Sequence, residues 1–300
     1  MAKILVTDGM DKAGIERLKA QGHTVDEQFY ELDALKEVIG DYDCIVVRSA
    51  TKVREALIDI AAKGKLKLII RGGVGVDNID VQYAESKGIK VRNTPKASSA
   101  SVAELAIGHM FSLARHLYIS NVTMRKGEWN KKQYKGIELA GKTLGLIGSG
   151  RIGLETAKRA DALGMKVIYI NHKMHEVDGP FSLVTKEELL AQSDFISLHI
   201  PFIKAEGATI GEAEFAQMKD GVYLVNCARG GVVDEAALVA ALDSGKVAAA
   251  AVDVYEVEPT KNEALYSHPK VSMTPHIGAS TAEAQKRIGE EIVDLVKEVL

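Results

Sequence analysis

The sequence predicts an α/β protein built from two doubly wound parallel sheets. Short runs of β-branched and aliphatic residues alternate with helical patterns along all 300 residues, which is typical of parallel strands joined by crossover helices. A glycine-rich turn, Gly148-Ser-Gly150-Arg-Ile-Gly153, follows an apolar run and precedes a helical pattern. A chain of this length is too long for one ordinary hydrophobic core, so we expect two domains.

The first part of the chain carries five strand candidates separated by helical patterns. These strand candidates are Lys3–Thr7, His23–Glu27, Cys44–Arg48, Leu66–Arg71 and Lys90–Asn93. Between them, Lys12–Ala20 and Arg54–Ala62 carry apolar residues at helical spacing. This alternation predicts one parallel sheet with helices on both of its faces.

A second alternating series begins at Lys142. Its strand candidates are Thr143–Ile147, Lys166–Ile170, Phe195–Ile200, Val222–Asn226, Ala248–Val254 and Val271–Thr274. The chain therefore contains two complete α/β units.

Two longer helical patterns join and close these series. Ser98–Leu117 has small and apolar residues on one face and is expected to carry the chain into the second domain. Near the C-terminus, Ser280 and Glu283 predict a capping box, and apolar residues recur at Ile288, Ile292, Leu295 and Val299. We expect this helix to pack on the first domain, giving a discontinuous domain of residues 1–97 plus 281–300 around an inserted domain of residues 98–280. Periodicity leaves open the alternative that the helix stays with the second domain.

Composition argues against several classes of protein. The formal net charge of -3 gives no sign of a nucleic-acid or membrane-surface partner. Cys44 and Cys227 lie in apolar runs, so we expect buried free thiols, and no Cys/His spacing indicates a metal site. The N-terminus becomes polar too soon for a signal peptide, and no apolar run approaches the ~20 residues of a membrane span. By default we expect a cytoplasmic protein.

The glycine turn has the spacing that a dinucleotide pyrophosphate needs. Gly148 can turn sharply because it lacks a Cβ, Gly150 lets the backbone approach the phosphates, and Gly153 lets the new helix pack close to the strand. That helix directs free N–H groups and the positive end of its dipole at the anion. The alternative is a glycine-rich turn without a ligand, but the strand before it and the helix after it argue for the dinucleotide.

The coenzyme preference is open. About twenty residues after the turn, a NAD-binding unit usually places Asp or Glu to hold the ribose hydroxyls. Here the strand ends in Asn171, which can hydrogen-bond a ribose but carries no charge to repel a 2′-phosphate. Lys173, and His172 if protonated, could attract that phosphate or could simply be solvated loop residues. We choose NAD and leave NADP open.

Four further sequence blocks carry a family resemblance. They are Val47–Val53 (VRSATKV), Gly73–Asp80 (GVGVDNID), Val225–Gly231 (VNCARGG), and Asp253–Pro259 (DVYEVEP) with Thr274–Ser280 (TPHIGAS). With the glycine turn, they make the chain resemble the D-isomer-specific 2-hydroxyacid dehydrogenases over nearly its whole length. The first block is most similar to the members that act on 3-phosphoglycerate. The resemblance implies a Rossmann-type cofactor domain inserted in a flavodoxin-like substrate domain, with a cleft between them.

The resemblance also implies a catalytic trio of Arg229, Glu258 and His276. Each lies just beyond a predicted strand, and open parallel sheets bind ligands at the carboxyl ends of their strands. His276 can take the hydroxyl proton of a secondary alcohol, with Glu258 favouring the imidazolium, and Arg229 can grip a carboxylate. Taken singly, His276 could cap a turn, Glu258 could be a solvated loop charge, and Arg229 could pair with Asp234. Three reactive types at three strand ends argue together against coincidence.

Further contacts follow from the resemblance. The cofactor contacts that it implies are Val74, Gly148, Gly150, Arg151, Ile152, Gly153, Asn171, Cys227, Ala228, Asp253 and Gly278. For the substrate, Gly73 and Gly75 suit a carboxylate, and Arg48 and Arg71 suit a phosphate, although either arginine could instead belong to a surface ion pair. A homodimer joined through the cofactor domains is implied, with Leu105–Leu117 and Trp129–Tyr134 near the contact.

The sequence departs from the family pattern at three places. Pro201–Glu206 lacks both threonines of the usual Pro-Leu-Thr-x-x-Thr, and Ser98 stands where many phosphoglycerate enzymes have Asn. No C-terminal regulatory domain follows the last helix, so feedback inhibition by serine through it is not expected.

The function expected from the sequence is NAD-dependent oxidation of 3-phospho-D-glycerate to 3-phosphooxypyruvate, towards L-serine. Reduction of glyoxylate, hydroxypyruvate or another small 2-oxo acid is the alternative. A nucleotide-sensing binding protein with the same fold is a third hypothesis, from a different class.

Overall fold

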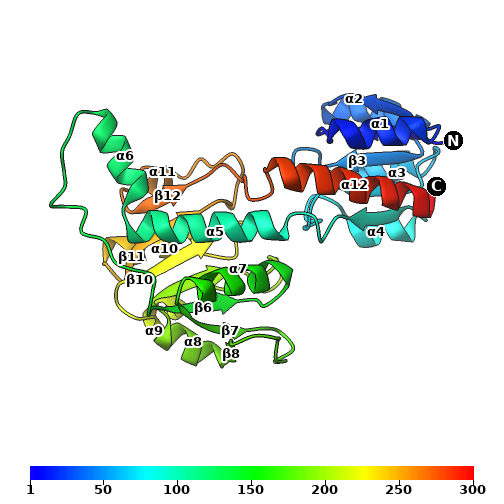
Figure 1. The fold of residues 1–300 in the computed structure, drawn as a ribbon. Helices are drawn as coiled ribbons and strands as arrows, with labels where there is room; N and C mark the ends of the chain where they lie inside the picture. Colours follow the sequence, from blue (N-terminus) through cyan, green and yellow to red (C-terminus); the bar gives the residue numbers. More distant parts are fainter. The chain divides into compact units, whose positions relative to one another are not determined.

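The computed structural model describes all 300 residues, which divide by their contacts into two compact units. Unit 1 comprises Met1–Ser98 with Ala279–Leu300, and unit 2 comprises Ser99–Gly278. Each unit is built on a sheet whose strand pairs are all parallel (Figure 1), so the predicted fold class is confirmed. No helix combines the length and the hydropathy that crossing a membrane requires.

Unit 1 has a five-stranded sheet in the order β2-β1-β3-β4-β5. Its strands are β1 (Lys3–Val6), β2 (Thr24–Glu27), β3 (Cys44–Val47), β4 (Leu68–Arg71) and β5 (Lys90–Asn93). The central strand β3 is buried throughout because its Cys-Ile-Val-Val run is apolar on both faces, as a strand covered by helices on both sides requires. The strand order reverses between β1 and β3, so a ligand is expected at the carboxyl ends of these two strands.

Helices cover both faces of this sheet. They are α1 (Lys12–Ala20), α2 (Leu32–Val38), the 3-10 helix η1 (Ile39–Asp41), α3 (Glu55–Ala61), α4 (Val81–Ser86) and α12 (Ala282–Val299). The first helix and the last pack closely, because a Cβ on Gly14 would lie 3.2 Å from the Cα of Gly289. Ile288 and Ile292 share one apolar cluster with Leu18 of α1, so the C-terminal helix belongs to the core of unit 1.

The start of α12 corrects the sequence prediction. The predicted capping box of Ser280 and Glu283 is wrong, because the helix begins at Ala282 and its N-cap is Thr281. The Oγ1 atom of Thr281 accepts a hydrogen bond from the backbone N–H of Ala284 at 3.1 Å. Apolar spacing predicts which face of a helix is buried, but it does not determine the first residue, which depends on the backbone angles of the cap.

Unit 2 has a seven-stranded sheet in the order β12-β11-β10-β9-β6-β7-β8. Its strands are β6 (Thr143–Ile147), β7 (Lys166–Ile170), β8 (Ser182–Leu183), β9 (Phe195–Leu198), β10 (Val222–Asn226), β11 (Val247–Val252) and β12 (Val271–Met273). Only β8 was missing from the sequence prediction, since two residues are too few to show a period. The strand order reverses between β6 and β9, and the glycine turn leaves β6 at this point.

The helices of unit 2 surround this sheet. They are α5 (Ser99–Ala114), α6 (Leu117–Arg125), α7 (Arg151–Ala162), α8 (Lys186–Gln192), α9 (Glu212–Gln217), α10 (Glu235–Asp243) and α11 (Glu263–Tyr266). In Figure 1, the long helix α5 runs beside α7, and it also packs against β10 and β11. The helix predicted over Ser98–Leu117 is confirmed over Ser99–Ala114, but its predicted end is wrong, because the chain turns at His116, whose φ is 54°. The apolar pattern continues across this turn, so periodicity cannot detect it.

Candidate active site

The predicted trio lies in unit 2, just beyond three neighbouring strands. Arg229 follows β10, Glu258 follows β11 and His276 follows β12. The Nδ1 atom of His276 lies 2.8 Å from Oε2 of Glu258, and the two side chains are 31% and 36% exposed. The fold thus joins an imidazole and a carboxylate from different loops, and solvent still reaches both.

The backbone around His276 is held in an uncommon conformation. Its φ is 53°, in the left-handed region, which costs a residue with a Cβ about 1 kcal/mol. The next two N–H groups, of Ile277 and Gly278, donate to the carboxylate of Asp253 at 2.8 and 2.9 Å. On the other side, the N–H of His276 donates to the carbonyl of Thr274 at 3.1 Å. The turn is therefore fixed on both sides of the imidazole.

Tyr255 ties the Glu258 loop to this turn. Its N–H donates to Oε1 of Glu258 at 3.2 Å, and its hydroxyl donates to the carbonyl of Thr274 at 2.8 Å. Burial raises the pKa of Tyr255 to about 12, so the phenol keeps its proton at neutral pH and acts as a donor. Tyr255 was not predicted from the sequence, since a lone tyrosine between Val254 and Glu256 carries no pattern.

Asn226 shapes the turn that presents Arg229. Its amide oxygen accepts from the N–H of Ala228 at 3.0 Å, and its amide nitrogen donates to the carbonyl of Arg229 at 3.0 Å. The thiol of Cys227, which lies between Asn226 and Ala228 in the chain, is buried. Burial raises the pKa of this thiol, so it stays protonated. Cys227 and Cys44 are both buried and free, as predicted.

Within the glycine turn, only the position of Gly150 faces open space that a ligand could fill. A Cβ on Gly148 would lie 2.6 Å from the carbonyl oxygen of His199, and one on Gly153 would lie 2.1 Å from that of Gly148, so neither position admits a side chain. A Cβ on Gly150 would meet nothing within 4 Å. Helix α7 starts at Arg151 without a side-chain cap, which leaves its first N–H groups for another acceptor. These residues fit a dinucleotide pyrophosphate.

Asn171, at the end of β7, reaches back to this turn. Its amide nitrogen donates to the hydroxyl of Ser149 and to the carbonyl of His175, each at 2.8 Å, and its amide oxygen accepts from the N–H of His175 at 3.1 Å. An amide oxygen accepts two hydrogen bonds, so one acceptor position is left for a ribose hydroxyl. His172 and Lys173 follow in an exposed loop.

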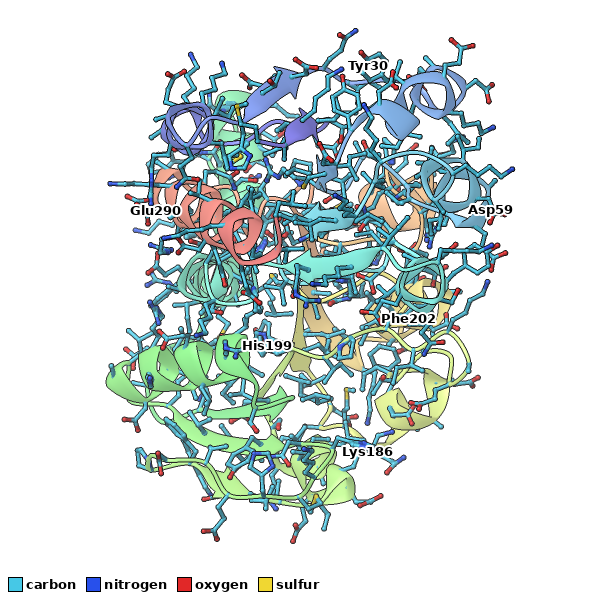
Figure 2. The ribbon with its side chains drawn as sticks, turned by 90° about the vertical axis from the view of Figure 1, so that its right-hand side faces the viewer. Tyr30, Asp59, Lys186, His199, Phe202 and Glu290 are labelled. Atoms are coloured by element: carbon cyan, nitrogen blue, oxygen red, sulfur yellow. The ribbon has the colours of Figure 1, made fainter.

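His199, labelled in Figure 2, is a residue that the sequence analysis missed. It follows β9 and lies against the glycine turn, with Nε2 3.0 Å from the hydroxyl of Ser197. Its Nδ1 atom is buried without a hydrogen-bond partner in the protein. Burial lowers the pKa of this imidazole to about 4, so it is neutral at physiological pH. The sequence feature that could have identified His199 is a polar residue at the end of an apolar strand.

The predicted phosphate partners lie in unit 1, at the carboxyl ends of β3 and β4. Arg48 directly follows β3, where the strand order reverses, and its guanidinium has no hydrogen bond or ion pair. Its backbone is fixed, because its N–H donates to Asp8 at 2.7 Å and its carbonyl accepts from Asn78 at 2.7 Å. Arg71 ends β4 and donates to the hydroxyl of Ser49 at 3.3 Å. Neither Asp8 nor Asn78 was predicted, since both act on the main chain.

The loop after β4 lies against the guanidinium of Arg71. A Cβ on Gly73 would overlap that group, and its φ of +151° also favours glycine. The carbonyl of Gly73 accepts from the N–H of Thr94 at 3.0 Å, and that of Val74 accepts from the side chain of Asn93. Among the predicted cofactor contacts, only Val74 belongs to unit 1, and the others belong to unit 2.

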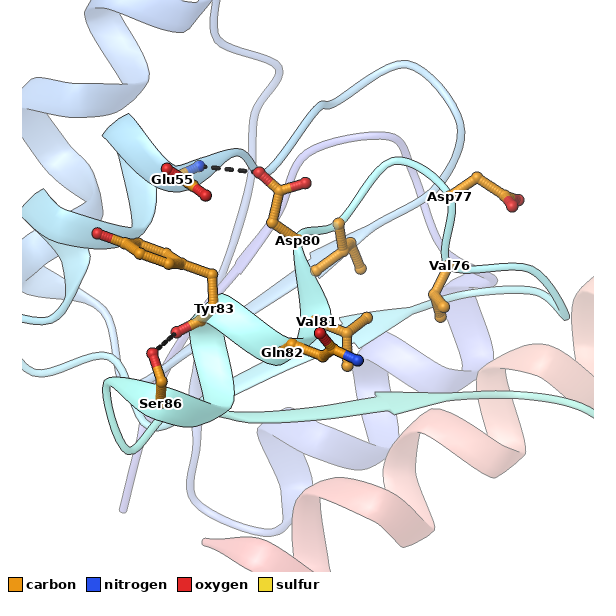
Figure 3. A pocket seen from close by; sticks show the side chains of 9 residues that line it. Glu55, Val76, Asp77, Asp80, Val81, Gln82, Tyr83 and Ser86 are labelled. Carbon is orange, nitrogen blue, oxygen red and sulfur yellow. Dashed lines mark hydrogen bonds between the residues drawn. The ribbon is translucent and has the colours of Figure 1, made fainter. Parts of the chain in front are cut away.

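A cavity of about 600 Å³ in unit 1 lies elsewhere (Figure 3). Its ionisable lining includes Glu55, Asp77 and Asp80, and the carboxylate of Asp80 accepts from the N–H of Glu55 at 3.1 Å. An acidic lining disfavours an anionic acid, and none of the predicted substrate residues lines this cavity. The cavity is therefore not the candidate site.

Comparison with known proteins agrees with the geometry. Residues 107–278, most of unit 2, match the family model described as D-isomer specific 2-hydroxyacid dehydrogenase, NAD binding domain. Hydroxypyruvate reductase of Thermotoga maritima is 49% identical over 298 residues, which cover 98% of this chain and 97% of that protein. D-3-phosphoglycerate dehydrogenase of Methanocaldococcus jannaschii is 47% identical over 304 residues, which cover 100% of this chain but only 58% of that protein.

A solved structure extends the match to three dimensions. The D-lactate dehydrogenase from Aquifex aeolicus, complexed with NAD and lactic acid, has a TM-score of 0.87 and 31% identity, covering 98% of this chain and 94% of that chain. Sequence and structural matches therefore span both units and agree on one kind of chemistry. The chain belongs to the D-isomer-specific 2-hydroxyacid dehydrogenase family and is an NAD-dependent oxidoreductase of 2-hydroxy acids.

Proposed function

We propose that the protein oxidises 3-phospho-D-glycerate to 3-phosphooxypyruvate with NAD. The observation that carries this substrate is Arg48, a guanidinium without an ion-pair partner at the point where the unit 1 strand order reverses. A phosphate is recognised well by a guanidinium because the planar fork can donate two parallel hydrogen bonds. Asp8 and Asn78 hold the Arg48 backbone before any ligand arrives, which reduces the ordering that binding requires.

In this proposal His276 removes the proton of the C2 hydroxyl. Its Nδ1–H donates to Glu258, which leaves the lone pair of Nε2 to face the substrate. The carboxylate of Glu258 then stabilises the imidazolium that forms. Bound NAD would supply the acceptor for the hydride that leaves C2. Arg229 grips the substrate carboxylate and polarises the carbonyl that develops at C2.

The residues that contact the cofactor are likewise part of this proposal. Gly148, Gly150 and Gly153, with the N–H groups of Arg151 and Ile152, would hold the pyrophosphate, and Asn171 would hold the ribose. The nicotinamide half of the cofactor would be contacted by Cys227, Ala228, Asp253 and Gly278. Val74 is a further proposed contact. The carboxylate of Asp253 already accepts hydrogen bonds from Thr274, Ile277 and Gly278, so any contact with the carboxamide uses a remaining lone pair.

The substrate carboxylate and phosphate have separate proposed partners. In unit 1, the backbone of Gly73 and Gly75 would bind the carboxylate. Arg48 would bind the phosphate, with Arg71 beside it at the same edge of the sheet, where Val47 of β3 pairs with Arg71 of β4. Two arginines at the ends of neighbouring strands suit a ligand of more than one negative charge.

Reduction of hydroxypyruvate is a second candidate, and a specific observation favours it. The relative named hydroxypyruvate reductase matches this chain over 97% of its own length, whereas the phosphoglycerate dehydrogenase relative is matched over 58%. Hydroxypyruvate carries a hydroxyl where 3-phosphooxypyruvate carries a phosphate, so its binding does not require Arg48. The two candidates therefore differ in their dependence on one side chain.

The test is a substrate panel on wild type, R48A and a control, R54A, which removes an arginine paired with Asp80 in the same unit. NADH formation is followed with 3-phosphoglycerate and D-glycerate, and NADH consumption with hydroxypyruvate and glyoxylate. We expect 3-phosphoglycerate to be the best hydroxy acid, and R48A to lower kcat/KM for it by about 10- to 100-fold, as for a lost charged hydrogen bond. Hydroxypyruvate should be unaffected. If kcat/KM for D-glycerate equals that for 3-phosphoglycerate, or if R48A leaves kcat/KM for 3-phosphoglycerate unchanged, the second candidate is favoured.

We further propose a homodimer joined through unit 2. No residue of α6 is buried, and Leu117, Val122 and Met124 are 52%, 48% and 51% exposed, with Trp129 beyond them at 78%. Apolar surface of this extent is typical of an interface. Sedimentation of wild type should give two chains, and the double variant L117E/V122E one chain, whereas K19E on the exposed face of α1 should change nothing. A wild type that sediments as a monomer would contradict the dimer.

A further inference from the structure

A buried polar chain connects α5 to the turn that carries His276. His109 lies on α5 and is only 4% exposed. Its Nε2 atom lies 3.1 Å from the hydroxyl of Thr274, which donates to Oδ1 of Asp253 at 2.6 Å. That carboxylate accepts the two N–H groups that follow His276. Three side chains from α5, the end of β12 and the end of β11 thus converge under one turn.

The direction of each hydrogen bond follows from the donors available. The single hydroxyl hydrogen of Thr274 goes to Asp253, so Nε2 of His109 must carry the hydrogen that Thr274 accepts. Its Nδ1 then accepts from the hydroxyl of Ser272, 3.4 Å away. Burial lowers the pKa of His109, although the charge of Asp253 opposes the shift, and this agrees with a neutral ring that has one donor and one acceptor.

We propose that His109 and Thr274 are positioning residues for His276. They orient the carboxylate of Asp253, and Asp253 holds the strained turn that aims the imidazole. The inference rests on the proposed role of His276 as the residue that takes the substrate proton. It assigns a function to a helix residue that touches neither the glycine turn nor the trio.

Packing alone does not explain His109. Its neighbours on α5, Ile107, Met110 and Leu113, belong to an apolar cluster in which an aliphatic side chain would be buried without needing a hydrogen-bond partner. A histidine here requires partners for both ring nitrogens, and the structure provides them on β12 and just after it. The partner of Nε2 leads, through one hydroxyl, to the only carboxylate that holds the turn at His276.

Loss of the His109 donor should loosen the turn without removing a reacting group. In H109L, the hydroxyl of Thr274 is free to rotate away from Asp253, and the left-handed backbone at His276 loses part of its support. We expect the rate of the hydride-transfer step to fall about tenfold, which corresponds to ~1.4 kcal/mol in the transition state. The KM for substrate should change less than twofold, because the substrate contacts neither His109 nor Asp253 in the proposed arrangement.

The experiment compares two pairs of full-length variants. H109L removes the donor, whereas H109Q keeps an N–H at a similar distance from the backbone. T274V removes the hydroxyl at nearly constant volume, whereas T274S keeps it. For each we would measure the pre-steady-state rate of NADH formation by stopped flow, the steady-state KM values, and the thermal midpoint. We expect H109L and T274V to be slow, and H109Q and T274S to recover at least half of the wild-type rate.

The outcomes separate this inference from the proposed function. If H109L and T274V fold, with lowered thermal midpoints, but transfer hydride at the wild-type rate, then His109 and Thr274 are only structural and the inference is wrong. If H109Q and T274S are as slow as H109L and T274V, hydrogen bonding is not the cause and the inference is also wrong. H276A is measured beside them: if it retains wild-type turnover, the proposed role of His276 fails, whatever the other variants do.

Discussion

At the scale of single residues, the proposed reacting groups are positioned by neighbours to which no reacting role is assigned. His276 is aimed by a turn that Asp253 holds, and Arg229 leaves a turn that Asn226 shapes. The family resemblance pointed to His276 and Arg229 from the sequence, and their positions at strand ends agreed with it. The supporting hydrogen bonds were not predictable, because each joins atoms from loops far apart in the chain.

Coenzyme choice is also decided by single residues. Asn171 carries no charge, and Lys173 is exposed two residues further on, so a 2′-phosphate would meet attraction rather than repulsion. We predict that K173E lowers kcat/KM for NADP about fivefold to tenfold and leaves kcat/KM for NAD nearly unchanged, since one exposed charge pair contributes about 1 kcal/mol.

Initial rates with both coenzymes check this prediction. K166E makes the same change of charge at the opposite end of β7 and is the control. An equal loss with NAD and NADP in K173E would place Lys173 outside the phosphate contact.

At the scale of elements, the pattern of apolar residues predicted the strands better than the ends of the helices. Buried runs such as Cys44–Val47 are recognisable in the sequence because all of their residues are apolar. The break at His116 and the start of α12 at Ala282 depend on backbone angles and caps, which leave little trace in hydropathy.

The corrected cap of α12 gives a direct comparison between neighbouring residues. T281A removes the hydroxyl that accepts from Ala284 and should lower the free energy of unfolding by about 1 kcal/mol. S280A changes the residue that the sequence pattern favoured and should change it by less than ~0.3 kcal/mol. Urea denaturation followed by circular dichroism measures both, and a larger loss in S280A than in T281A would restore the original capping box.

At the scale of the whole molecule, each of the two sheets carries one of its candidate ligand-binding features where its strand order reverses. Arg48 follows β3 beside β1 in unit 1, and the glycine turn follows β6 beside β9 in unit 2. Ligands bind at such points because the flanking connections run to opposite faces and leave the carboxyl ends of the strands uncovered. The same arrangement buries His199 beside the glycine turn.

Buried His199 should make the stability of the fold depend on pH. Its pKa falls from 6.5 to about 4 on burial, so between these values the unfolded chain binds a proton that the folded chain does not. The free energy of unfolding is therefore highest above pH 6.5 and should decrease as the pH falls towards 4, by on the order of 3 kcal/mol. His109 shifts in the same direction.

Denaturation curves of wild type and H199N between pH 7 and pH 4 isolate this contribution, because the carboxylates titrate in both proteins. We expect the stability difference between the two proteins to change in favour of H199N as the pH falls. A difference that is constant with pH would mean that His199 becomes protonated within the folded protein.

The sequence by itself determined the α/β class and six of the seven strands of unit 2, because apolar spacing is a property of consecutive residues. The candidate residues at the strand ends came from the motifs that carry the family resemblance. Only the tertiary structure decided the contact of 2.8 Å between His276 and Glu258, the hold of Asp253 on the left-handed turn, and the burial of His109 and His199. Those depend on strand order and register, which bring together segments that no pattern along the chain relates.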